Sequence, residues 1–209
     1  MTLKLAQFET GFLPTNTYVG FNEETGHGFL VDPGDYDAQI DEAMKELGIT
    51  QLDYILLTHG HFDHILGVPG FRENHPEAAV VISKTDAPFL TDPVLSHCAA
   101  HGIPQEPVEA DLLVEDGSVI PFDDGQLTVI ATPGHTAGSV CFVIEDILFA
   151  GDTLFAMSCG RTDFPESVPD QMRPSLQKLA ALDGDYNVLP GHDALTTLEY
   201  ERAHNPFLQ

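Results

Sequence analysis

Three histidines and one aspartate lie within six consecutive positions of this chain, in the segment HGHFDH at residues 59–64. The apolar run before it, residues 52–58, has the composition of a buried β-strand. If His59 and His61 continue that extended chain, both imidazoles point to the same side, while Asp63 and His64 begin the next helix. Imidazole nitrogens and carboxylate oxygens are ligands for Zn²⁺, Fe and Mn. One short loop could therefore serve two metal ions.

Ligand-type side chains also follow three later apolar runs. His135, Asp152 and His192 come shortly after residues 127–131, 147–150 and 186–189, and each directly follows a glycine. Ligands commonly bind at strand ends in open sheets, and glycine lets the backbone turn sharply there. A single histidine at a strand end usually has a structural role. Four strand ends that each offer histidine or aspartate favour one metal centre.

The elements that must position these residues are short apolar strands and a few amphipathic helices, an α/β pattern. Strands are predicted at residues 3–8, 17–21, 28–31, 52–58, 78–82, 127–131, 139–144, 147–150 and 186–189, and helices at 36–47, 171–182 and 197–204. Pro174 must lie in a first helical turn, or the helix must start there. The elements within residues 76–121 are harder to predict from the pattern, and short helices are expected there at 87–90 and 94–100. The chain, residues 1–209, is read as one domain of two halves that meet within residues 102–124.

Composition excludes several functions. The 209 residues include 33 Asp+Glu against 8 Lys+Arg, a formal net charge of −25. Such a surface repels nucleic acids and anionic lipids, so a small-molecule substrate is expected, with no nucleic-acid or membrane partner. Three cysteines at unrelated spacings, no recognisable secretory signal and no apolar run of about 20 residues favour a cytoplasmic protein with reduced thiols. The sequence leaves the oligomeric state open.

The H-x-H-x-D-H array, followed by a later His, Asp and His, resembles the signature of the metallo-β-lactamase fold superfamily. The resemblance extends from the N-terminal strands to the last helix. It implies a four-layer αββα sandwich with a dinuclear metal site at the edge of its two sheets. The family pattern implies His59, His61 and His135 as ligands of the first metal, Asp63, His64 and His192 as ligands of the second, and Asp152 as the bridge. Zn²⁺ is the first choice for both ions, with Fe or Mn as alternatives.

Three segments narrow the resemblance within the superfamily. Residues 151–155 (GDTLF), 159–165 (CGRTDFP) and 201–208 (ERAHNPFL) are similar to the glyoxalase II (hydroxyacylglutathione hydrolase) group, above all to its short bacterial members. The GRTDF segment also resembles persulfide dioxygenases, relatives that use a single iron. Long glyoxalase II enzymes carry basic glutathione-binding residues on a C-terminal helical domain that this sequence lacks. The resemblance therefore does not identify glutathione as the thiol component of the substrate.

Hydrolysis is the chemistry that such a centre favours. Water held between two divalent ions loses its proton near neutral pH and becomes a hydroxide nucleophile, which Asp63 and Asp152 would orient. A thiolate leaves without protonation, whereas an amide nitrogen needs a placed acid, so a thioester such as S-lactoylglutathione is the primary prediction. The alternatives are a mononuclear iron persulfide dioxygenase, a lactone or ester hydrolase on the same scaffold, and a non-catalytic metal-binding protein.

The other candidate residues have weaker support. Arg161 and Arg173 follow Asp152 and are candidates for binding an anionic substrate group, although ion pairing within this acidic chain explains them equally well. His97 and His101 are four residues apart, a spacing that by itself suggests a second metal site. No other ligand-type residues converge on them in the sequence pattern, so they are interpreted as a solvated or partly packed pair.

Overall fold

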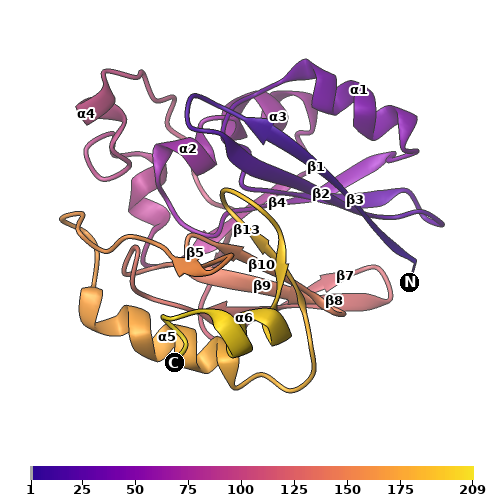
Figure 1. Ribbon diagram of the computed structural model, residues 1–209. Helices are drawn as coiled ribbons and strands as arrows, with labels where there is room; N and C mark the ends of the chain where they lie inside the picture. The colour runs from indigo at the N-terminus through magenta and orange to yellow at the C-terminus, as the bar shows by residue number, and fades with distance from the viewer. Residues whose placement is uncertain (1) are drawn as a thin grey trace.

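Two six-stranded β-sheets form the centre of the molecule in the computed structural model, which describes residues 2–209 (Figure 1). In spatial order, the first sheet contains β1 (Leu3–Thr10), β2 (Thr15–Asn22), β3 (His27–Val31), β4 (Gln51–Leu56), β5 (Ala79–Ser83) and β6 (Leu112–Val114). The second contains β14 (Thr196–Thr197), β13 (Asn187–Pro190), β10 (Ile147–Gly151), β9 (Val140–Ile144), β8 (Gly125–Ala131) and β7 (Val119–Phe122). β11 (Leu154–Phe155) and β12 (Ser158–Cys159) form a separate small hairpin.

Helices cover the outer faces of both sheets (Figure 1). The helices are α1 (Ala38–Glu46), α2 (Phe62–Ile65), α3 (Val68–Asn74), α4 (Cys98–His101), α5 (Pro169–Ala180) and α6 (Leu198–His204), with a 3₁₀ turn η1 at Ala87–Leu90. None of the helices described for residues 2–209 has the length and apolar character that a bilayer span requires.

Three buried apolar clusters define the layers. One cluster joins the two sheets face to face, with Phe29 of β3 packed edge-on against Phe122 of β7 and Phe149 of β10. A second lies between the first sheet and helices α1 and α3, and a third lies between the second sheet and helices α5 and α6. Helix, sheet, sheet and helix therefore follow one another, which confirms the predicted α/β fold with its four-layer αββα sandwich.

Most predicted elements are present, with ends shifted by a few residues. The helix predicted at residues 36–47 is α1, and the strand predicted at 52–58 is β4. The two halves meet between β6 and β7, inside the range predicted for the boundary. β6 and β7 themselves were not predicted, because both are short and two residues of each are exposed.

Two predictions about helices were wrong. Pro174 lies inside α5 rather than in its first turn, because the helix begins at Pro169. The hydrogen bond that this proline cannot donate leaves the carbonyl of exposed Asp170 to water, which limits the cost. The helix predicted at residues 94–100 is only the four-residue α4, which His97 precedes in a left-handed conformation with φ of 70°.

Candidate metal centre

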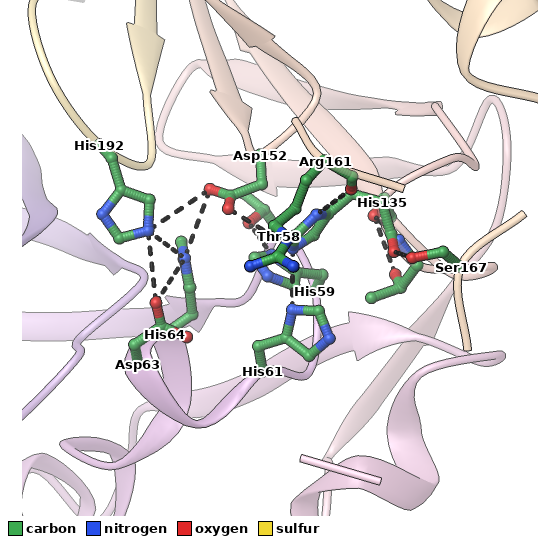
Figure 2. A network of polar contacts seen from close by, with 12 residues as sticks. Thr58, His59, His61, Asp63, His64, His135, Asp152, Arg161, Ser167 and His192 are labelled. Atoms are coloured by element: carbon green, nitrogen blue, oxygen red, sulfur yellow. Dashed lines mark hydrogen bonds and ion pairs between the residues drawn. The ribbon is translucent and has the colours of Figure 1, made fainter. Parts of the chain in front are cut away.

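Seven histidine and aspartate side chains converge where four strands end, at one edge of the two sheets (Figure 2). His59, His61, Asp63 and His64 follow β4; His135 follows β8; Asp152 follows β10; and His192 follows β13. The structure thus brings together all seven residues that the sequence pattern singled out. β8, β10 and β13 run in the same direction, because β9 pairs antiparallel with both β8 and β10 and β10 pairs parallel with β13, so their ends lie at the same edge of the second sheet. The residues that follow β4 of the first sheet meet them there.

His59, His61 and His135 form the first group of potential ligands. Nδ1 of His61 lies 2.8 Å from Nε2 of His135, and the ring of His59 is 4.8 Å from each of the other two rings. Burial, assisted by the neighbouring histidines, lowers the pKa of His59 well below its usual value and that of His61 to about 4. Both imidazoles are therefore neutral at physiological pH, the form in which a histidine binds a metal.

Asp63, His64 and His192 form the second group. Nε2 of His192 lies 3.3 Å from both Oδ2 of Asp63 and Nε2 of His64. Burial alone would raise the pKa of Asp63, but His64 and His192 hold it well below its usual range. Burial would likewise lower the pKa of His64, but Asp32, Asp63 and Asp152 raise it to about 10. Without a metal, this group is thus held together by charge pairing.

Asp152 lies between the two groups. Its Oδ2 is 3.4 Å from Nε2 of His135, and its Oδ1 is 3.5 Å from Nε2 of His64 and 3.7 Å from Nε2 of His192. Oδ1 of Asp152 and Nε2 of His59 are buried polar atoms without a hydrogen-bond partner among the described residues. Buried polar atoms are rarely left unpaired, so both atoms fit the role of metal ligands.

In each of the five histidines, the ring nitrogen that faces away from the centre, here called the outward nitrogen, makes a polar contact. The partners are the Thr58 hydroxyl for His59 Nδ1, Glu166 for His61 Nε2, Asp32 for His64 Nδ1, the Arg161 carbonyl for His135 Nδ1 and the Pro14 carbonyl for His192 Nδ1. Contacts of this kind fix the ring orientation and the tautomer of a metal-binding histidine. The inward nitrogens all face the centre, so the donor set fits a pair of divalent cations.

Two buried aspartates hold the loops that carry these side chains. Asp32 accepts hydrogen bonds from the Thr58 amide at 2.8 Å and the Thr58 hydroxyl at 2.7 Å, as well as contacting His64. Asp86 accepts hydrogen bonds from the Gly60 amide at 3.1 Å and the Thr136 hydroxyl at 2.6 Å, which ties a loop of the first half to a loop of the second. Sequence reasoning missed both, because a lone aspartate in a turn carries no signal of such distant partners.

Sequence reasoning also missed Glu166 and the position of His97 beside the centre. Glu166 contacts His61 and His97 through Oε1, and the ring of His97 packs 5.1 Å from that of His61. His97 is partly buried and His101 is exposed, as expected, but they do not form a pair, since His97 packs against His61 and His101 against Phe62. Burial would raise the pKa of Glu166, but hydrogen bonds from the two histidines lower it.

Arg161 and Arg173 lie apart from the converging nitrogens. Both line a surface pocket of about 510 Å³ together with Phe207 near the C-terminal end of the chain. The Arg161 guanidinium is exposed, makes hydrogen bonds of 2.6 and 2.7 Å to Asp163, and lies over the ring of Phe164. Only its backbone carbonyl reaches the centre, through His135.

Gly160→Ala is expected to destabilise the protein by about 1–3 kcal/mol. A Cβ at this position would lie 1.8 Å from the Asp152 carbonyl oxygen and 3.4 Å from Cβ of His135, so the backbone must shift. Denaturant unfolding measures the effect. Gly184→Ala is the comparison, because no described atom lies within 4 Å of its added Cβ and its cost comes from a φ of 85° alone. Equal unfolding midpoints for Gly160→Ala and the parent would contradict the prediction.

Comparisons with known proteins extend this description. Residues 10–192 match the model of the metallo-beta-lactamase superfamily. Hydroxyacylglutathione hydrolase from Aeromonas hydrophila is 35% identical over 91% of this chain and 67% of its own length. The mitochondrial persulfide dioxygenase of Homo sapiens is also 35% identical, over 93% of this chain and 71% of its own length.

Solved structures agree over almost the whole chain. The BLEG-1 B3 metallo-β-lactamase superposes with a TM-score of 0.92 and 33% identity, covering 99% of this chain and 100% of its own. The protein TTHA1623, solved in a di-iron-bound form, superposes with a TM-score of 0.84 and 32% identity, covering 97% of this chain and 100% of its own.

Proposed function

Because this chain belongs to the metallo-β-lactamase superfamily, we propose that it is a metal-dependent hydrolase that cleaves a thioester such as S-lactoylglutathione. The observation that carries the proposal is the convergence of five histidine nitrogens and two carboxylates as two adjoining ligand groups. The hydroxyacylglutathione hydrolase among the relatives supports a thioester as substrate.

The proposed ligand sets follow the two groups. His59, His61 and His135 hold the first cation, Asp63, His64 and His192 hold the second, and Asp152 contacts both. Two divalent cations bound there, Zn²⁺ as first choice and Fe or Mn as alternatives, would supply an acidified water and an electrophile for the carbonyl oxygen.

The chain's own residues orient the reaction. Asp63 and the largely buried Asp152 are the carboxylates of the centre, and the unpartnered Oδ1 of Asp152 can accept a hydrogen bond from the attacking water. The low pKa of Asp63 keeps it ionised and therefore an acceptor at every physiological pH. No side chain has to protonate the leaving group, because a thiolate leaves unaided.

Arg161 and Arg173 are proposed to meet an anionic group of the substrate, since both face the same pocket. Arg161→Ala is expected to raise KM for an anionic thioester about two- to fivefold with little change in kcat, as an exposed ion pair contributes about 1 kcal/mol or less. Steady-state kinetics measures the two constants. Arg72→Ala, which removes a partly exposed arginine that pairs with Asp111, is the control. A fall in kcat with unchanged KM would contradict this role.

A single-iron persulfide dioxygenase is the second candidate, because a protein of that name is as similar in sequence as the hydrolase. The complete second ligand group favours the hydrolase. A lactone or another ester remains an alternative substrate on the same scaffold. We further propose a cytoplasmic location, which the three free cysteines support.

The deciding experiment is hydrolysis of S-lactoylglutathione by metal-replete protein, with a chelator-treated sample as control. Turnover that the chelator abolishes, with two metals per chain, is the expected result. One iron per chain with oxygen consumption on a persulfide would establish the dioxygenase instead. Protein that retains no metal after loading would refute the proposed centre.

A further inference from the structure

A carboxylate outside the seven converging residues contacts one of them from behind. Oε1 of Glu166 lies 2.8 Å from Nε2 of His61, and it also contacts Nε2 of His97. The other nitrogen of His61, Nδ1, is the one that faces the first group, 2.8 Å from Nε2 of His135. Glu166 therefore touches His61 on the side that faces away from the centre.

His97 is brought to this position at a conformational cost. Its φ of 70° is in the left-handed region, which costs a non-glycine residue about 1–3 kcal/mol unless the surroundings enforce it. Its ring packs 5.1 Å from that of His61 and 4.9 Å from that of Phe164. The side chains of His97 and Glu166 are only 17% and 14% exposed. The segment that carries His97, within residues 76–121, thus becomes part of the wall of the centre.

We propose that Glu166, held in place by His97, is a positioning residue that orients His61 and keeps the Nδ1 lone pair of His61 directed at the first metal. In a neutral imidazole only one nitrogen carries the proton, and a carboxylate that accepts a hydrogen bond from Nε2–H leaves Nδ1 free. Such a partner also makes the ligand nitrogen more basic. This inference rests on the metal assignment in the proposed function and is independent of the substrate.

The effect is expected at one metal only. Each ligand group contains one histidine whose outward nitrogen meets a carboxylate, His61 with Glu166 and His64 with Asp32. The outward nitrogens of His59, His135 and His192 meet neutral oxygens. Loss of Glu166 removes the charged partner of the first group and leaves that of the second group in place.

The test is a titration of the metal-free protein with Zn²⁺ against a competing chelator. Glu166→Ala is expected to lower the affinity for one of the two Zn²⁺ equivalents about 10–100-fold, the usual effect of removing such a partner. Glu166→Gln should recover most of that loss, because its amide oxygen still accepts a hydrogen bond from Nε2–H. Asp163→Asn, in the same loop but paired with Arg161, is the control and should bind both equivalents within about twofold of the parent.

A second readout is the visible absorption spectrum of the Co²⁺-loaded protein, which reports ligand geometry at the metal. The spectrum should change in Glu166→Ala and return towards that of the parent in Glu166→Gln. If the alanine variant does not fold, Glu166→Asp keeps the charge but withdraws it from His61, and it should weaken the same equivalent.

Two results would overturn the proposal. One is a folded Glu166→Ala variant with parental affinity for both equivalents. The other is a parent that binds three equivalents of Zn²⁺ and a His97→Ala variant that binds two. In that case His61, His97 and Glu166 would themselves form a cation site. Affinity and spectrum do not depend on turnover, so failure of the thioesterase assay alone would leave this test intact.

Discussion

Replacing Asp152 by alanine is expected to release metal from the protein and to lower kcat/KM at least about 10³-fold. Asp152 is the only described carboxylate within 4 Å of nitrogens from both ligand groups, His135 on one side and His64 and His192 on the other. A bound cation supplies several kcal/mol of transition-state stabilisation, and each 1.36 kcal/mol is a factor of ten in rate. Weakening both sites at once therefore affects catalysis more than loss of any terminal ligand.

Metal content by elemental analysis and hydrolysis of the thioester check this prediction together. The fold should be retained, because the contacts of Asp152 with the histidines are 3.4–3.7 Å long and His64 keeps its other carboxylate partners, Asp32 and Asp63. His59→Ala is also expected to lose metal and activity with the fold retained, but to lose less activity than Asp152→Ala, because His59 belongs to the first ligand group alone. Asp183→Ala removes an exposed aspartate from a turn and is the matched control. If both ligand variants kept parental metal content and activity, the assigned roles would be wrong.

The individual strands and helices were predictable because they depend on local apolar periodicity, whereas the four-layer arrangement was implied by the family resemblance. β4 is an apolar run that ends at a turn, and α1 places Ile40 and Met44 on one buried face. β6 is only three residues long, and two of those three are exposed. Its local sequence therefore shows no alternation of apolar and polar residues that would predict a strand paired with β5. Such a strand is defined by its neighbour in the sheet rather than by its own sequence.

The converging residues were predictable for a related reason. His59 and His61 lie in one compact motif, and the later ligand-type residues each follow a strand and a glycine, so the signal is local. Glu166 and His97 lie 69 positions apart and meet only because two separate loops fold over the same edge. Partners of that kind depend on tertiary structure, and no spacing rule identifies them.

Replacing Asp32 by alanine is expected to destabilise the metal-free protein by about 3–5 kcal/mol, the usual cost of removing one member of a buried charged network. Asp32 is 2% exposed and contacts the amide and hydroxyl of Thr58 and Nδ1 of His64. Its removal leaves these three donors unpaired in the interior. Asp32 also has a φ of 48°, which asparagine tolerates better than alanine, so Asp32→Asn should cost less.

Denaturant unfolding in the presence of a chelator measures these differences. Glu145→Ala is the control for the backbone, because Glu145 is exposed and has a similar φ of 53°. It should cost less than about 0.5 kcal/mol, because glutamate and alanine both carry a Cβ in this conformation and the side chain is exposed. An Asp32→Ala variant that loses no more stability than this control would show that the three contacts contribute nothing.

The pH dependence of the free energy of unfolding distinguishes the effect of the Asp32 charge from that of its hydrogen bonds and packing. Burial lowers the pKa of His64, but Asp32 leads the carboxylates that raise it to about 10, whereas an unfolded histidine titrates near 6.5. A raised folded pKa contributes stability that is fully present below about pH 6.5 and is lost as the pH rises through 10. The stability difference between parent and Asp32→Asn should therefore be largest near pH 6 and shrink towards pH 10. A difference that stayed constant over this range would mean that Asp32 acts through hydrogen bonding and packing rather than through its charge on His64.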